Sequence, residues 1–119
     1  MEKRRYTLSK QEKLKNKKCI EQLFLKGESF TYSPVRVVFL KKDLLLQSNQ
    51  VAFSVSKKNF KSAVKRNRIK RLMREAYRLN KYDLTQKGMQ LMFIYTHRKI
   101  ESFSAINFSI KSILNKVNK

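Results

Sequence analysis

The chain has 119 residues, enough for one domain with a modest hydrophobic core. Its 29 Lys and Arg residues against 8 Asp and Glu residues give a formal net charge of +21, so we expect a polyanionic partner, with nucleic acid ahead of a membrane surface. No apolar run approaches a membrane span, residues 1–18 lack the apolar segment of a secretory signal, and the single cysteine excludes an intrachain disulfide. We therefore expect one cytoplasmic domain over residues 1–119, without a membrane partner.

Residues 1–8 are expected to form a flexible basic tail. A helix follows, and it has two candidate starting points: residues 9–12 have the spacing of a capping box, and Asn16 is a second candidate N-cap. Gly27 marks its end. The apolar residues of this helix, which we expect to pack over a sheet, are Ile20, Leu23 and Phe24.

Two strands are predicted next. Residues 35–40 begin after Pro34 and alternate between two sets of side chains that are both largely apolar, so one face meets the core and the other is covered or used. Residues 51–56 alternate in the same way and lead directly into a basic helix. Residues 30–32 are a candidate for a third strand, whereas the leucines at 44–46 indicate no element.

The most basic part of the chain lies between residues 55 and 78, where Glu75 is the only acid. Ser62 is a suitable N-cap, and the apolar residues after it follow helical spacing, so we predict a helix over residues 62–79. The apolar stripe of this helix consists of Ile69, Leu72, Met73 and Ala76. A merely solvated helix face usually mixes charges of both signs, and this one scarcely does, which favours a face that binds a polyanion.

The triplet Arg66-Asn67-Arg68 lies near the start of this helix. Arginine offers forked donors that fit phosphate oxygens and a plane that stacks on bases, and the Asn67 amide both donates and accepts. Backbone N–H groups at the start of a helix add to an anion site. This combination suits structured RNA.

A polar linker over residues 80–88 is followed by a buried strand at 89–95 and a final helix at about 102–116. The order is therefore helix, two or three strands, helix, strand, helix. It predicts a two-layer α/β sandwich with a mixed sheet of about four strands and three helices.

Few side chains could support catalysis by the chain alone. His97 is the only histidine and Cys19 the only cysteine, so no cluster of His and Cys ligands can form. No pair of carboxylates shares a motif that a general acid and base would require. We therefore do not expect the chain to cleave RNA by itself.

The segments SVSKK, Ser54–Lys58, and AVKRNRIKRLMREAYR, Ala63–Arg78, resemble the signature of the protein component of bacterial ribonuclease P. The agreement covers most positions of both segments in type and order. The link at 59–62 departs from it, because it lacks the glycine that many members carry there and is one residue longer. The resemblance implies the same sandwich fold, with a left-handed crossover through the basic helix.

The resemblance also implies a function. In this family a catalytic RNA holds Mg²⁺ and hydrolyses the phosphodiester between the 5′ leader and the mature tRNA, leaving a 5′-phosphate. The protein would bind that RNA and the leader of the precursor tRNA, without an organic cofactor or an obligate protein partner.

The expected sites follow from the same resemblance. The leader would lie in a cleft between the first helix and the sheet, formed by Ile20, Phe24, Val37 and Phe39, with Ile20 at a position that is aromatic in the family. Asn67 would help to organise a metal ion shared with RNA. The catalytic RNA would contact Lys57, Lys58, Lys65, Arg66, Asn67, Arg68, Lys70, Arg71 and Arg74.

Other interpretations remain open from the sequence. Phe24, Val37 and Phe39 are also ordinary core residues by type. A ribosomal or other structural RNA-binding protein would share the size, charge and architecture. A self-sufficient nuclease would need catalytic groups that the composition does not offer, and nothing resembles a helix-turn-helix or zinc-dependent DNA-binding motif.

Overall fold

The computed structural model describes residues 12–41, 49–85 and 87–118. The elements in chain order are α1 (Lys17–Lys26), β1 (Glu28–Tyr32), β2 (Val35–Lys41), β3 (Gln50–Val55), α2 (Ala63–Asn80), the short 3₁₀ helix η2 (Lys81–Asp83), β4 (Met89–Tyr95) and α3 (Phe103–Val117). The predicted order is confirmed, and the candidate strand near residue 30 is β1. The predictions for residues 1–8 and 44–46 fall outside the described residues, as does most of the candidate capping box.

The four strands form one mixed sheet in the order β1-β2-β4-β3. β2 pairs antiparallel with β1 and β4, and β3 pairs parallel with β4. Parallel neighbours need a crossover connection, and α2 supplies it between β3 and β4. The carboxyl ends of β3 and β4 therefore lie at the same edge of the sheet, which places the loops that follow them close together.

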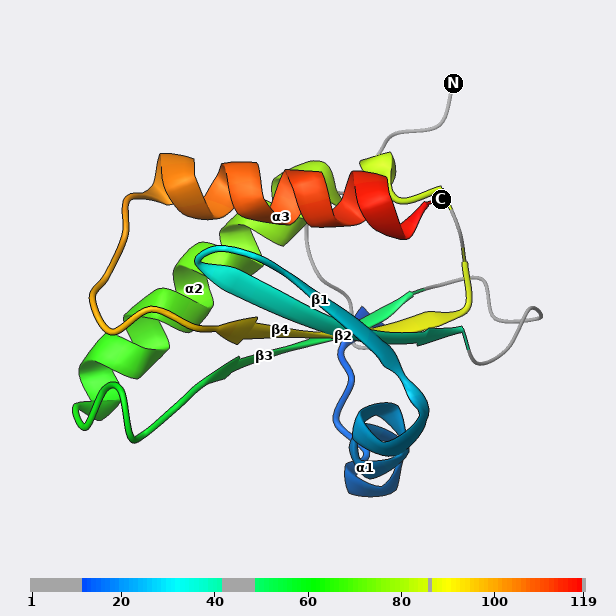
Figure 1. Ribbon diagram of the computed structural model, residues 1–119, viewed down its shortest axis with the longest axis horizontal. Helices are drawn as coiled ribbons and strands as arrows, with labels where there is room; N and C mark the ends of the chain where they lie inside the picture. The colour runs from blue at the N-terminus through cyan, green and yellow to red at the C-terminus, as the bar shows by residue number, and fades with distance from the viewer. Residues whose placement is uncertain (1–11, 42–48, 86, 119) are drawn as a thin grey trace.

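The helices cover the two faces of the sheet unequally. Figure 1 shows α2 and α3 together over one face, where they form the two-layer body of the sandwich, and α1 against the other face. The larger core lies beneath α2 and α3 and includes Tyr77, Phe93 and Ile110. A smaller cluster beneath α1 consists of Leu14, Leu23, Val38 and Met92. None of the described helices is long and apolar enough to cross a membrane.

Aromatic packing joins α2 to the sheet. The rings of Phe53 and Phe93 stack with centroids 5.6 Å apart, and Tyr77 of α2 lies 5.8 Å from Phe93. Burial raises the pKa of the Tyr77 hydroxyl above its ordinary value, and the nearby charge of Glu12 adds to the shift. These contacts fix α2 so that its opposite side faces outward.

Local interactions set both ends of α1. The Asn16 side chain accepts hydrogen bonds from the backbone N–H groups of Lys18 at 2.9 Å and Cys19 at 3.4 Å, so the helix begins at the second candidate cap. At the other end the N–H of Gly27 donates to the carbonyl of Leu23 at 2.8 Å. A Cβ at Gly27 would lie 2.4 Å from that carbonyl oxygen and 2.9 Å from the carbonyl oxygen of Phe39. Glycine is needed here because two backbone segments approach so closely.

Candidate nucleic-acid interface

The first turn of α2 begins as the sequence predicts. The Ser62 hydroxyl accepts a hydrogen bond from the N–H of Lys65 at 3.3 Å and caps the helix. The buried stripe contains Ile69, Met73 and Ala76, with Tyr77 as an additional fully packed member and Leu72 half-buried. The stripe faces the sheet and α3, so the sides of the helix that are turned away from both face solvent.

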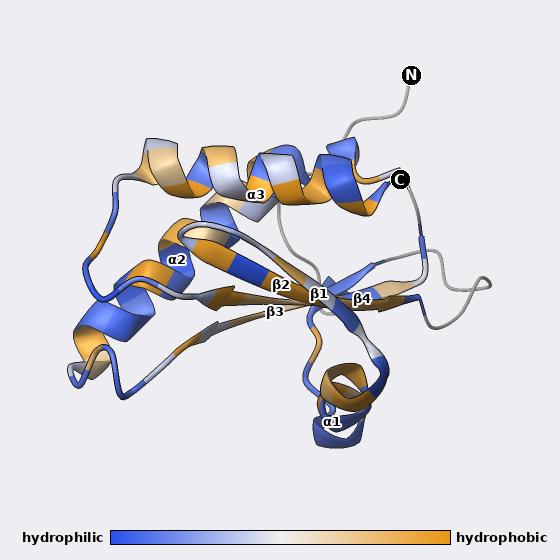
Figure 2. Cartoon of the chain, in the orientation of Figure 1, coloured by the Kyte–Doolittle hydropathy of each residue, from blue (hydrophilic) through white to orange (hydrophobic). Residues whose placement is uncertain are grey.

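Those solvent-facing sides of α2 are strongly basic, and Figure 2 shows much of the helix as hydrophilic. Its one acid, Glu75, is paired with Arg78, and this ion pair lowers the pKa of the Glu75 carboxyl. The face is therefore a nearly uncompensated positive surface. Its exposed members, with the two lysines after β3, are Lys57, Lys58, Lys65, Asn67, Arg68, Arg71 and Arg74, and its half-buried members are Arg66 and Lys70.

The Arg66 side chain also makes hydrogen bonds within the protein. Its Nη1 donates to the backbone carbonyls of Phe60 at 2.8 Å and Lys61 at 2.9 Å. The guanidinium thus ties the first turn of α2 to the link that precedes it, the segment in which the sequence lacks a glycine. Arg68, by contrast, is exposed, and its side chain makes no hydrogen bond or ion pair with another described residue.

Two cations that the sequence prediction missed extend this surface. A hollow of about 590 Å³ beside the start of α2 is lined by Lys61 and Lys65 and by Arg98 and Lys99 from the loop after β4. The Tyr95 hydroxyl fixes that loop, because it donates to the carbonyl of Lys99 at 2.7 Å and accepts from the N–H of Glu101 at 2.8 Å. The sequence contained one indication of these cations. Basic residues follow β3 and β4, and the carboxyl ends of these parallel strands lie at the same edge of the sheet.

The predicted leader cleft is only partly assembled. Ile20 and Phe24 lie on α1 as expected, with Ile20 half-buried against the smaller cluster and 51% of Phe24 exposed. Val37 and Phe39 do not join them. Both side chains point to the opposite face of the sheet, where Val37 is fully buried in the main core and Phe39 packs against it.

This placement corrects the prediction for β2. Successive strand residues point to opposite faces, so an error of one position transfers a side chain across the sheet. The residues of β2 that share the face of α1 are Arg36, Val38 and Leu40, and Ile94 pairs with Arg36 from β4. Arg36 is exposed and donates to the Ser29 hydroxyl at 3.1 Å. The face near α1 therefore carries an exposed aromatic ring, apolar side chains and a cation.

The groups that could perform acid, base or metal chemistry are scattered. Among residues 12–41, 49–85 and 87–118, no three His, Cys, Asp or Glu side chains lie together as a metal site would require. His97 lies 3.8 Å from the Glu101 carboxylate and edge-on to Tyr95, and Cys19 is half-buried on α1. Neither forms part of a recognisable nucleophile and base pair.

Comparisons with known proteins agree with one another. The Ribonuclease P family model matches residues 8–118. The Ribonuclease P protein component of Clostridium acetobutylicum is 35% identical over 108 residues, covering 90% of this chain and 89% of the relative. That of Porphyromonas gingivalis is 46% identical over 78 residues, covering 65% of this chain and 57% of the relative, so this chain spans little more than half of that protein's length.

Solved structures match the fold. The RNase P protein of Thermotoga maritima superposes with a TM-score of 0.76 at 22% identity, covering 88% of this chain and 96% of the other. The RNase P protein of Staphylococcus aureus gives a TM-score of 0.76 at 23% identity, covering 89% and 94%. With the family model matching nearly the whole sequence, the conclusion is that the chain belongs to the Ribonuclease P family.

Proposed function

We propose that this chain is the protein subunit of a cytoplasmic ribonuclease P ribonucleoprotein, which removes the 5′ leader from precursor tRNA. The observation that carries the proposal is the outward face of α2, where cations surround Asn67 and only Glu75 carries a negative charge. Such a surface neutralises a polyanion and releases its counterions, which is the main source of protein affinity for RNA. The hydrolysis itself is assigned to the RNA.

Docking on the catalytic RNA is assigned to the basic face of α2 together with the loop after β4. Arg68, Arg71 and Arg74 are exposed, and arginine matches phosphate oxygens with two parallel donors. Arg98 and Lys99 widen the same positive surface beside the helix start. This surface would position the protein on the RNA through phosphate contacts, which carry little sequence information.

The 5′ leader is assigned to the other face of the sheet, beside α1. Phe24 is the exposed ring there, Ile20 adds apolar area, and Arg36 supplies a cation. Single-stranded RNA binds such surfaces because bases stack on rings while cations follow the phosphates. The two RNA partners would thus occupy different surfaces of one small domain.

Magnesium is assigned to the RNA. Asn67 offers one exposed amide oxygen, and Glu75 of the same helix is occupied by Arg78, so these residues alone do not make the oxygen-rich site that Mg²⁺ prefers. When bound by the RNA, the ion supplies Lewis-acid chemistry at the phosphate. The residues of this chain would hold the RNA in place and leave the ion to it.

The test is cleavage of a precursor tRNA by the catalytic RNA at low magnesium, with and without the protein, and with the protein alone. The proposal predicts that the protein restores cleavage at the leader junction and is inactive alone. Tight RNA binding without any gain in cleavage would favour a structural RNA-binding protein instead. Cleavage by the protein alone would support a self-sufficient nuclease.

A further inference from the structure

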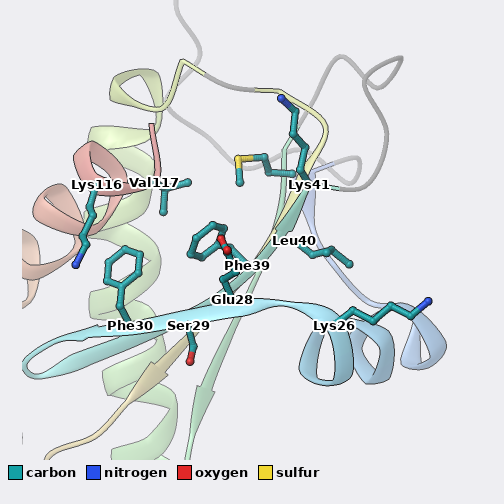
Figure 3. Close-up of a pocket in the computed structure, with 10 residues that line it drawn as sticks. Lys26, Glu28, Ser29, Phe30, Phe39, Leu40, Lys41, Lys116 and Val117 are labelled. Carbon is teal, nitrogen blue, oxygen red and sulfur yellow. The ribbon is translucent and has the colours of Figure 1, made fainter. Parts of the chain in front are cut away.

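A second hollow lies on the face of the sheet that α1 does not cover. It has a volume of about 960 Å³ and opens between the end of α3 and the hairpin of β1 and β2 (Figure 3). Phe30, Phe39, Met89 and Val117 form its apolar part. Its rim reaches Lys26 at the end of α1 and Leu40 of β2, but its aromatic residues lie on the face opposite to Phe24, and it lies at the end of α3 away from the start of α2.

The aromatic residues of this hollow are partly exposed because the helical layer ends there. In the same face of the sheet Val37 and Phe93 are fully buried beneath α2 and α3. Phe30 and Phe39 lie nearer the edge, and both are only half-buried, with ring centroids 5.7 Å apart at 74°. Two rings in edge-to-face contact thus line a partly open hollow.

Positive charge surrounds this hollow. The Lys116 ammonium group lies 4.6 Å from the centroid of the Phe30 ring, and Lys41 extends from the end of β2 on the other side. Both lysines are exposed. An ammonium group over an aromatic face is held by cation–π attraction, so Lys116 occupies one face of Phe30 and keeps a cation next to the Phe39 ring.

One acid interrupts the positive rim. Glu28 pairs with Phe39 across the strands, and its carboxylate lies beside the Phe39 ring in Figure 3. A carboxylate would repel a phosphate but accepts hydrogen bonds from the N–H groups of a base. Guanine alone among the four RNA bases presents two adjacent N–H donors, N1–H and N2–H, on its Watson–Crick edge, which matches the two oxygens of a carboxylate.

We propose that this hollow binds one unpaired guanine of single-stranded RNA. The base would stack on the Phe39 ring with Phe30 beside it, Glu28 would accept from its Watson–Crick edge, and Lys41 and Lys116 would contact the flanking phosphates. The combination of ring, cation and acceptor is what sequence-selective binding of single-stranded RNA requires. The inference goes beyond the proposed function, because it does not depend on docking by α2 or on the leader.

The test measures binding of labelled pentanucleotides to the full-length chain at about 0.15 M salt, where weak long-range attraction is screened. Pentauridylate is compared with the same chain carrying one central guanine. The guanine-containing chain is expected to bind more tightly, by roughly fivefold or more, as a bidentate contact to a base provides. Glu28→Gln should abolish that preference, since an amide cannot accept both bonds, and should not weaken pentauridylate binding, because it removes a charge that repels phosphate.

Lys116→Ala tests the phosphate contact and has a matched control in the same helix. Lys111 is also exposed on α3 but does not line the hollow, so Lys111→Ala removes the same charge elsewhere. Lys116→Ala should weaken binding of the guanine-containing chain by about threefold or more, and Lys111→Ala should not. NMR shifts on titration should centre on Phe30, Phe39 and Val117.

Equal binding of the two pentanucleotides, or a guanine preference that survives Glu28→Gln, would overturn the proposal. So would equal losses for the two lysine variants, or shifts confined to α1 and α2. Arg68→Ala distinguishes a failure of this proposal from a failure of the proposed function. It should weaken binding to the catalytic RNA and leave the guanine preference intact, so either idea can fail while the other stands.

Discussion

Two arginines of α2, two positions apart, have different surroundings. Arg66 donates to the carbonyls of Phe60 and Lys61, so part of its guanidinium stabilises the link before the helix. Arg68 is exposed and makes no such contact among the described residues. The same residue type is therefore held by the backbone at one position and open to solvent at the other.

Arg68→Ala should weaken binding to the catalytic RNA without lowering the melting temperature. The loss of one phosphate contact should reduce the slope of log K against log salt by about 0.7–0.9. The measurement is RNA affinity over a series of salt concentrations, together with thermal unfolding. An unchanged slope would remove Arg68 from the docking surface.

Arg66→Ala should lower stability as well as RNA affinity. The part-buried carbonyl of Phe60 and the exposed carbonyl of Lys61 lose a charged donor. A hydrogen bond to a charged group contributes about 1.5–3 kcal/mol, so a loss near the lower end of this range is expected in the free energy of unfolding. The measurement is urea unfolding of Arg66→Ala, with Arg68→Ala and the unmodified protein as the comparisons. If Arg66→Ala unfolds at the same urea concentration as the unmodified protein, the hydrogen bonds from Arg66 to the link do not stabilise the fold.

At the scale of elements, the position of α1 depends on Gly27. The helix ends there in an ordinary extended conformation, so the glycine is not required by its backbone angles. It is required by space, because a Cβ would press on the carbonyl oxygens of Leu23 and Phe39, which are backbone atoms and cannot rotate away. Any side chain at this position must move α1 relative to β2.

Gly27→Ala is therefore expected to destabilise the domain by about 1–3 kcal/mol, the range found when atoms are forced into a packed site. It should also weaken leader binding, because Ile20 and Phe24 move with the helix. Urea unfolding and precursor binding provide the two measurements. Lys26→Ala, at the exposed neighbouring position, serves as the control and should change stability little.

At the scale of the whole molecule, the architecture could be predicted because its periodic signals are strong. α2 and α3 each bury one stripe of residues at helical spacing. Ser62 caps α2 and Asn16 caps α1, and each side chain accepts hydrogen bonds from backbone N–H groups. The resemblance added the family, and the matched fold agrees with it. These features depend on short-range spacing, which a single sequence contains.

The face of β2 could not be predicted in the same way. Both sets of alternating residues in this strand are largely apolar because helices pack against both faces of the sheet, so no polar side identifies which set faces α1. The resemblance is carried by residues 54–58 and 63–78 and does not fix the register of β2, so the prediction for Val37 and Phe39 named the wrong face. Arg98 and Lys99 were missed because only the sheet order brings their loop to the start of α2.

The domain as a whole places two proposed RNA surfaces on different sides of one sheet. The basic face of α2 is assigned to the catalytic RNA and the α1 face to the leader. The two tasks should therefore be separable by mutation. Phe24 is half-exposed and Leu25 beside it is 82% exposed, so replacing either with alanine should leave the fold intact and provide a matched pair.

The most direct test is single-turnover cleavage at low magnesium and subsaturating protein, using precursors with a long leader and with a one-nucleotide leader. Phe24→Ala should slow cleavage of the long-leader precursor alone, by roughly fivefold or more if one stacked base is lost, and Leu25→Ala should not. Arg68→Ala should slow both precursors equally, because it acts on assembly with the catalytic RNA. If Phe24→Ala slowed both precursors equally, or Arg68→Ala only the long-leader one, the division into two surfaces would be contradicted.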